Sequence, residues 1–286
     1  MEWIPAPLPN SIEEGIKENL ISWDQLANSH AQGKGSEFYR IDNWLSGETT
    51  LAPWEIREIG AISGKTLLHL QCHIGTDTLS WSREGAIVTG LDFSTNSIKE
   101  AERFAELMGI RNSRFVISRV QDAVESLDGE KFDVLYTGKG ALCWLPDIEE
   151  WATVCSKLVK QGGILYLEES TPMFNALTPM KFQKGTVFGL KNDLFNKNPV
   201  SEIGQGSYAD PNWPGKMRIH TWEYTYGGII NALVRNGFRI EHLNERDEVF
   251  FNPHPENLVK SRSNYWSLKE NSLKFPLSFS IKATRI

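Results

Sequence analysis

From Lys65 onward, short apolar runs alternate with amphipathic helical stretches, and this alternation restricts the possible folds more than any other feature. The predicted strands span 65–71, 86–91, 115–118, 132–137 and 164–167, and the predicted helices between them span 76–84, 97–108 and 147–160. Strands that alternate with helices form right-handed βαβ units, which build a parallel sheet. The sequence therefore predicts an α/β fold with a doubly wound, mostly parallel sheet.

The alternation is interrupted once and then returns. Residues 170–220 are rich in Pro, Gly, Asn and aromatic side chains and show no clear periodicity. A connection of this length within a domain is often a lid. A helix over 221–236 and strands over 238–243 and 277–283 follow. Aromatic residues at helical positions before residue 60 predict an N-terminal helical cap rather than an independent domain.

Charge and cysteine content exclude several classes of protein. The net charge of −6 includes no Lys/Arg block, whereas a nucleic-acid substrate requires a basic footprint. No apolar run reaches the ~18 residues of a membrane helix, and the first residues lack the pattern of a secretion signal. Cys72, Cys143 and Cys155 are too scattered for a disulfide framework or a Cys-x-x-Cys metal site. We therefore expect a cytoplasmic protein without metal, nucleic acid or membrane partners.

The residues that say most about ligand binding lie between the first two predicted strands. Gln71-Cys72-His73-Ile74-Gly75 form a sharp turn where a strand ends and a helix begins. Ligands of open α/β sheets bind at this edge, and a helix start attracts anions. Asp92 ends the second strand, where its carboxylate can accept hydrogen bonds from two ribose hydroxyls. This arrangement fits a cofactor that contains a nucleoside.

The glycine content of the turn narrows the choice of cofactor. A dinucleotide site requires G-x-G-x-x-G, whose glycines let the pyrophosphate approach the backbone. Only Gly75 stands in this turn, and the chain has no G-x-x-x-x-G-K-S/T segment. The turn therefore suits a ligand with a carboxylate head and no pyrophosphate.

The stretch HLQCHIGTDTLSWSREGAIVTGLDFS (69–94) resembles a bacterial branch of class I S-adenosylmethionine-dependent methyltransferases. In that branch His-Leu-Gln-Cys-His replaces the usual Asp-x-Gly-x-Gly. Similar segments over 23–30, 140–147, 162–169 and 231–241 extend the resemblance to nearly the whole chain. The sequence departs from the branch at Thr171 and Tyr224, where relatives often carry histidine.

The resemblance implies a Rossmann-like sheet of seven strands, the last of them antiparallel. It implies a cap over 1–60, a cofactor-binding half of the core over 61–169, a lid and acceptor-site insertion over 170–220, and the C-terminal part of the core over 221–286. The cofactor would be S-adenosyl-L-methionine and the product S-adenosyl-L-homocysteine. The residues that would bind the cofactor are Gln71, Cys72, His73, Gly75, Asp92, Phe93, Gln121, Asp122, Thr137 and Gly138.

The acceptor side is less well defined. We expect a small-molecule acceptor that is methylated on an oxygen, nitrogen, sulfur or carbon atom, and a monomer or homodimer. His30 is the leading candidate for a general base, followed by Glu169 and Tyr39. Trp144, Trp213, His220 and Tyr224 would line the acceptor site, or form a core within the lid. The alternatives are a protein that binds the cofactor without turnover and a nicotinamide-dependent oxidoreductase on a similar sheet.

Overall fold

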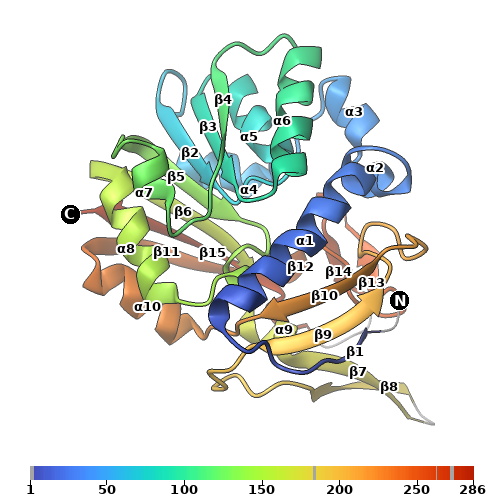
Figure 1. Cartoon of the computed structure of the whole chain (residues 1–286). Helices are drawn as coiled ribbons and strands as arrows, with labels where there is room; N and C mark the ends of the chain where they lie inside the picture. The colour runs from blue at the N-terminus through green and yellow to red at the C-terminus, as the bar shows by residue number, and fades with distance from the viewer. Residues whose placement is uncertain (1–2, 183–184, 262, 271–273) are drawn as a thin grey trace.

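The computed structural model describes residues 3–182, 185–261, 263–270 and 274–286, and its centre is a seven-stranded sheet (Figure 1). The strand order is β11-β15-β6-β5-β2-β3-β4. The bounds are β2 Thr66–Leu70, β3 Ile87–Asp92, β4 Ser113–Ile117, β5 Phe132–Gly138, β6 Val159–Ser170, β11 Phe238–Arg246 and β15 Ser278–Arg285. Strands β4, β3, β2, β5 and β6 are parallel, whereas β15 runs antiparallel to β6 and β11. The predicted mostly parallel sheet with an antiparallel last strand is confirmed.

Both faces of the sheet are buried, because consecutive strand residues pack into different hydrophobic clusters. Leu68 and Leu135 pack on the side of α8 (Ile148–Leu158) and α10 (Tyr226–Arg235). Leu67 packs on the side of α4 (Pro53–Ile59) and α5 (Thr76–Arg83). Both leucines of β2 are fully buried. This two-sided burial explains why the strands read as continuous apolar runs rather than as alternating ones.

Two predicted helices have different limits in the structure. The helix predicted over 221–236 begins only at Tyr226, because Thr225 is its N-cap and Thr221 is still paired in β10. The helix predicted over 147–160 ends at Leu158, since Val159 already pairs with Phe132 in the sheet. The remaining helices of the core are α6 (Thr95–Leu107), α7 (Ala123–Ser126) and the short 3₁₀ helix η1 (Leu142–Trp144).

The first sixty residues are largely helical. They contain α1 (Ile12–Ala31), α2 (Lys34–Phe38), α3 (Ile41–Leu45) and α4. Ser11 caps α1, which packs against α6 and against β10 (Lys216–Thr221). Strand β1 (Trp3–Pro5) pairs with β9 (Val200–Gln205), which in turn pairs with β10. The N-terminal segment and the residue range 170–220, called the insertion below, therefore share a three-stranded sheet.

The insertion contains regular structure that its sequence does not reveal. Besides β9 and β10 it holds α9 (Pro172–Ala176) and the pair β7 (Leu177–Phe182) and β8 (Gly185–Leu190). A second small sheet, β12-β14-β13 (Glu248–Val249, Trp266–Leu268, Leu258–Lys260), lies between β11 and β15 in the chain and was also not predicted. Short antiparallel strands show no clear alternation in the sequence, which is why both were missed.

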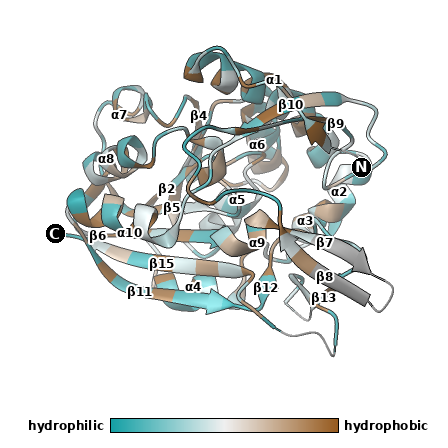
Figure 2. Ribbon diagram, turned by 90° about the horizontal axis from the view of Figure 1, so that it is seen from below, coloured by the Kyte–Doolittle hydropathy of each residue, from teal (hydrophilic) through white to brown (hydrophobic). Residues whose placement is uncertain are grey.

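The part of the insertion that contains α9, β7 and β8 packs against the small sheet β12-β14-β13. Figure 2 shows α9, β7 and β8 next to β12 and β13 at one end of the molecule. Phe174 of α9 belongs to one hydrophobic cluster with Val249, Leu258 and Leu268, and Phe188 of β8 packs against it. Among the described residues, no helix combines the length and apolar character of a membrane span.

Candidate active site

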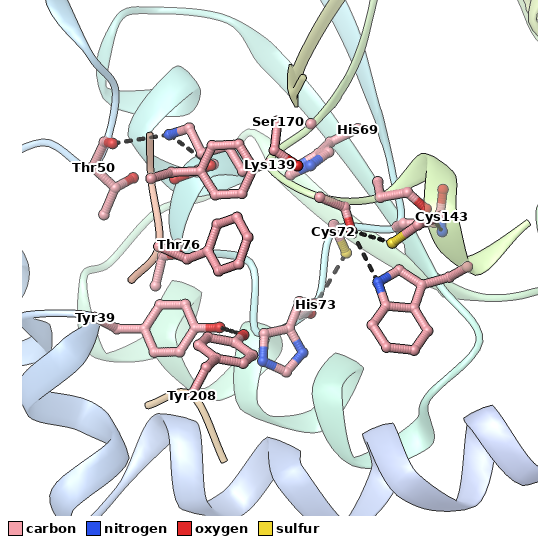
Figure 3. Close-up of a pocket in the computed structure, with 18 of the residues that line it drawn as sticks. Tyr39, Thr50, His69, Cys72, His73, Thr76, Lys139, Cys143, Ser170 and Tyr208 are labelled. Carbon is pink, nitrogen blue, oxygen red and sulfur yellow. Dashed lines mark hydrogen bonds and ion pairs between the residues drawn. The ribbon is translucent and has the colours of Figure 1, made fainter. Parts of the chain in front are cut away.

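A cavity of about 760 Å³ lies at the carboxyl ends of the parallel strands. Its walls come from the N-terminal helices, from the ends of β2, β3 and β5, from the insertion, and from residues 250–265. Figure 3 shows the part of this cavity around the predicted cofactor turn. The cavity therefore occupies the edge where ligands of open α/β sheets bind.

The turn 71–75 holds three residues in left-handed backbone conformations. Gln71 has a φ of 57°, His73 of 49° and Gly75 of 76°. A Cβ at Gly75 would lie 2.6 Å from the Cβ of Ala101, so packing as well as backbone conformation requires glycine there. The two non-glycine residues are strained, and such strain concentrates at functional sites. Gln71, Cys72 and His73 line the cavity, as predicted for cofactor contacts.

Asp92 connects the end of β3 to this turn. One carboxylate oxygen accepts the backbone N–H of His73 at 2.8 Å and the other accepts that of Ser94 at 2.9 Å. The side chain lines the cavity although the residue is only 6% exposed. Burial raises the pKa of Asp92 to about 6, against the opposing effect of the backbone N–H groups. The carboxylate thus stands at the cavity wall in a partly desolvated state.

The structure places only some of the other predicted cofactor residues in the cavity wall. Phe93, Gln121 and Gly138 line the cavity, together with Ser118, Arg119 and Val120, which the sequence did not single out. Asp122 is the N-cap residue of α7, its side chain is 59% exposed, and it does not line the cavity. Thr137 is buried behind the wall, and its hydroxyl has no hydrogen-bond partner within the described ranges.

His30 lies behind the cavity wall in a chain of hydrogen bonds. Its Nδ1 is 2.9 Å from Nε2 of His73, and its Nε2 is 2.8 Å from the hydroxyl of Ser207. The residue is fully buried and does not line the cavity. A proton transfer from a bound acceptor to His30 would have to exchange one of these hydrogen bonds. Through these hydrogen bonds His30 links the turn to α1 and to the insertion.

Tyr39 does line the cavity, and its hydroxyl is hydrogen bonded to that of Tyr208 in the insertion (Figure 3). Burial raises the pKa of Tyr39 well above its usual value, and the Tyr208 contact raises it further. Tyr39 therefore keeps its proton at neutral pH in this structure. Tyr208 was not predicted, because no local pattern brings residue 208 to the turn.

His73 gives this cluster a pH dependence that can be measured. Burial lowers the pKa of His73 to about 3, whereas an unfolded histidine titrates near 6.5. The unfolded chain then binds more protons at this site, so the free energy of unfolding should fall as the pH drops below about 6.5. His73→Asn removes the titrating group, and we expect a shallower decrease between pH 7 and pH 5 in urea denaturation. Identical slopes for both proteins would contradict this assignment.

Glu169 is buried beneath the loop that follows β5. It accepts the backbone N–H groups of Ala141 at 2.6 Å and Leu142 at 2.7 Å, and it does not line the large cavity. Burial raises the pKa of Glu169 to about 7 despite these hydrogen bonds. Its contacts shape the loop that carries Trp144, which does line the cavity and donates its indole N–H to the carbonyl of Gly140.

The other three residues predicted for the acceptor site have no place in the cavity wall. His220 is buried and hydrogen bonded to Glu18 and Ser201. The Tyr224 hydroxyl donates to the carbonyl of Leu145, and Trp213 also lies outside the lining. Other aromatic residues line the cavity, and those from α9 and from 250–265 are Phe174, Phe250, Phe251 and Tyr265. The run Phe250-Phe251-Asn252-Pro253-His254-Pro255 between two strands was the available signal for the second and third of these.

A buried group of charges at the cavity floor was also missed. The Lys139 ammonium lies 3.1 Å from a carboxylate oxygen of Glu55 and 3.1 Å from one of Asp77. It also donates to the carbonyl of Thr50, as Figure 3 shows. Tyr136 donates its hydroxyl to Glu55. The two carboxylates raise the pKa of Lys139, so the lysine stays charged although burial opposes this.

Comparison with known proteins identifies the central part of the chain. Residues 68–165 match the family described as "Methyltransferase domain". This part of the chain is therefore similar to methyltransferase domains. It contains the turn, Asp92 and the strands that carry them.

Relatives of the methyltransferase domain are found among curated proteins and solved structures. A ubiquinone biosynthesis O-methyltransferase of Photorhabdus laumondii is 35% identical over 114 residues, covering 39% of this chain and 45% of the relative. One from Escherichia coli strain SMS-3-5 is 33% identical over 165 residues, covering 54% and 64%. The chain thus spans about half to two thirds of the length of these relatives.

Two solved structures share the fold at low sequence identity. A putative S-adenosylmethionine-dependent methyltransferase from Listeria monocytogenes aligns with a TM-score of 0.60 and 19% identity, covering 82% of this chain and 96% of that one. An S-adenosylmethionine-dependent methyltransferase from Mesorhizobium loti gives 0.58 and 20%, covering 84% and 100%. The shared fold therefore extends well beyond residues 68–165.

Proposed function

We propose that this protein transfers the methyl group of S-adenosylmethionine to a small-molecule acceptor. The observation that carries the proposal is the convergence of the turn 71–75 and the Asp92 carboxylate on one large cavity. The methyltransferase domain and the shared fold support it. The net charge of −6 supports an acceptor other than nucleic acid, and the proposal extends to a cytoplasmic monomer or homodimer.

The residues of the turn fit the parts of this cofactor. Gln71 lines the cavity, and its side-chain oxygen is buried without a hydrogen-bond partner in the described part of the chain. An unpaired buried acceptor of this kind suits an amino group such as that of a methionine moiety. Asp92 would accept the ribose hydroxyls, and Phe93 and Gln121 would contact the adenine. The bound cofactor supplies a methyl group on a positively charged sulfur, which is a strong electrophile.

The protein mainly has to align the two reacting groups and exclude water. Alignment of this kind contributes ~7–11 kcal/mol in well-oriented reactions. Tyr39, Tyr208 and Trp144 line the cavity, and Glu169 accepts backbone N–H groups of the loop that carries Trp144. A base is required only for an acceptor that is protonated at working pH. His30, Tyr39 and Glu169 remain candidates, of which only Tyr39 lines the large cavity.

Calorimetric titration with S-adenosylmethionine, S-adenosylhomocysteine and NAD(H) tests the proposal directly. We expect the two sulfur compounds to bind and NAD(H) not to bind, because the turn has a single glycine and no room for a pyrophosphate against the backbone. A preference for NAD(H) would favour a nicotinamide-dependent oxidoreductase. Failure of all three to bind would overturn the proposed function.

A further inference from the structure

The cavity has an aromatic part built from α9 and from residues 250–265. We call the space bounded by Phe174, Phe250, Phe251 and Tyr265 the aromatic chamber. The ring centroids of Phe174 and Phe251 are 6.0 Å apart, those of Phe250 and Phe251 5.3 Å, and those of Phe250 and Tyr265 6.5 Å. Rings this close form a continuous apolar wall. Such a wall holds an apolar or aromatic body, and its ring faces attract cations.

One carboxylate in the cavity wall lacks a strong partner. The acidic residues that line the cavity are Glu48, Asp77, Asp92 and Glu223. Glu48 pairs with Arg40 at 2.5 Å, and Asp77 pairs with Lys139 at 3.1 Å. Asp92 accepts two backbone N–H groups. Glu223 has only the Asn192 amide at 3.4 Å, and within the described ranges it forms no ion pair.

Glu223 lines the same large cavity as the rings of the aromatic chamber and also lies beside the loop after β5. It shares a smaller adjoining cavity with Cys143, Ser170 and Asn175, and the last of these follows Phe174 in α9. The residue is half-buried. Burial raises the pKa of Glu223, which shows that its charged form lacks full solvation. A hydrogen-bond donor on a ligand would give the Glu223 carboxylate the partner that the protein does not provide.

The cations that line the cavity do not compensate this carboxylate. Lys139 already donates to Glu55, Asp77 and Thr50. Arg119 pairs with Glu13, outside the aromatic chamber. The charge of Lys191 lowers the pKa of Glu223. The Lys191 side chain is nevertheless exposed and forms no ion pair with Glu223 in the described structure. Burial and Lys191 lower the pKa of His254, so this imidazole is neutral at pH 7.

We propose that Glu223 recognises a protonated amino group on the acceptor, whose apolar body occupies the aromatic chamber. This inference rests on the proposed function and narrows its substrate class to amines with an apolar or aromatic body. The carboxylate accepts N–H hydrogen bonds from the ammonium, and the neighbouring ring faces stabilise the same charge. Glu223 is thereby a specificity-determining residue, whichever atom of the acceptor is methylated.

Three probes with one aromatic body test the charge preference in the protein saturated with S-adenosylhomocysteine. Phenethylamine, 2-phenylethanol and phenylacetate carry a positive, a neutral and a negative head group at pH 7.5. We expect phenethylamine to bind at least about ten-fold more tightly than either of the others, because a charge-assisted hydrogen bond is worth that much. Equal binding of the three, tighter binding of phenylacetate, or no binding of phenethylamine would overturn the inference.

Variants separate Glu223 from the general charge of the cavity. Glu223→Gln should weaken phenethylamine about ten-fold or more and change 2-phenylethanol by less than about two-fold. Glu202→Gln is the matched control, because Glu202 acts on Glu223 through space from β9 but does not line the cavity. Its effect should stay within about two-fold. Loss of phenethylamine binding by the same factor in both variants would contradict a specific role for Glu223.

The same samples distinguish failure of the inference from failure of the proposed function. Titration of each variant with S-adenosylhomocysteine and its thermal melting show whether the cofactor site and the fold are intact. If the wild-type protein does not bind S-adenosylhomocysteine, the proposed function fails. If it does bind, and Glu223→Gln leaves the probe preference unchanged, only the amine inference fails.

Discussion

Replacing Asp92 with alanine should lower the affinity for S-adenosylhomocysteine at least about 100-fold, because two charge-assisted hydrogen bonds to the ribose would be lost. The substitution also frees the backbone N–H groups of His73 and Ser94, which Asp92 now holds at 2.8 and 2.9 Å. The turn would then lose one of its links to the end of β3, and the backbone hydrogen bond from Cys72 N–H to the Leu91 carbonyl would remain. Calorimetric titration of the variant gives the affinity directly.

Asp122→Asn is the matched control for this measurement. Asp122 was predicted to contact the adenine, yet its side chain is 59% exposed and lies outside the cavity lining. We expect its affinity to stay within about two-fold of the wild-type value. A large loss at Asp122 together with a small loss at Asp92 would show that the cofactor binds in another place.

The pKa of Asp92 adds a pH dependence to the same prediction. A carboxylate with a pKa of about 6 becomes protonated below that pH and can no longer accept two hydrogen bonds from the ribose. The affinity of the wild-type protein should therefore fall below pH 6. The effect on folding has the opposite sign. Because the folded-state pKa is raised, the stability contributed by Asp92 decreases as the pH rises from about 4 to 6. Asp92→Ala should show neither trend.

Replacing Lys139 with methionine should destabilise the fold by about 3–5 kcal/mol, the usual cost of removing one partner from a buried ion pair. Lys139 is 14% exposed, and its ammonium holds Glu55 and Asp77 together at 3.1 Å. Without the lysine, two carboxylates would remain buried side by side. Urea denaturation at pH 7.5 measures the loss in free energy of unfolding.

Two further variants test the physical reason for this loss. Lys160→Met removes a largely exposed pair with Asp133, whose side chains are 44% and 34% exposed, and should cost less than about 1 kcal/mol. Adding Glu55→Gln to Lys139→Met should recover part of the stability by removing one buried charge. A loss below about 1 kcal/mol for Lys139→Met would show that the group of charges is solvated.

The sequence predicts the sheet and the cofactor turn because both depend on local patterns. Apolar runs, caps such as Ser94 and the spacing from Gly75 to Asp92 lie within single segments. The structure brings Gln71, His73 and Asp92 to one cavity wall, where the sequence-based reasoning expected cofactor contacts.

The acceptor side depends on contacts between distant segments, and local patterns therefore fail there. Lys139, Asp77 and Glu55 come from three separate segments, and none of them indicates its partners. His220 and Tyr224 have the chemistry of an acceptor site, yet their hydrogen bonds with Glu18 and Leu145 turn them away from the cavity. Glu223 lies between Trp222 and Tyr224 in the sequence, and no local pattern distinguishes it as a site residue.

The pairing of β1 with β9 has a consequence for how the molecule is assembled on the ribosome. Trp3 is opposite Gly204 and Pro5 is opposite Glu202, so the first described residues must wait until residue 205 has been synthesised before they find their partners. Until then the N-terminal strand has an unpaired edge, which is prone to aggregation. Contacts of such long sequence separation form late in folding. The pairing of β1 with β9 thus forms only after strands β2 to β6, which surround the turn 71–75, have been synthesised.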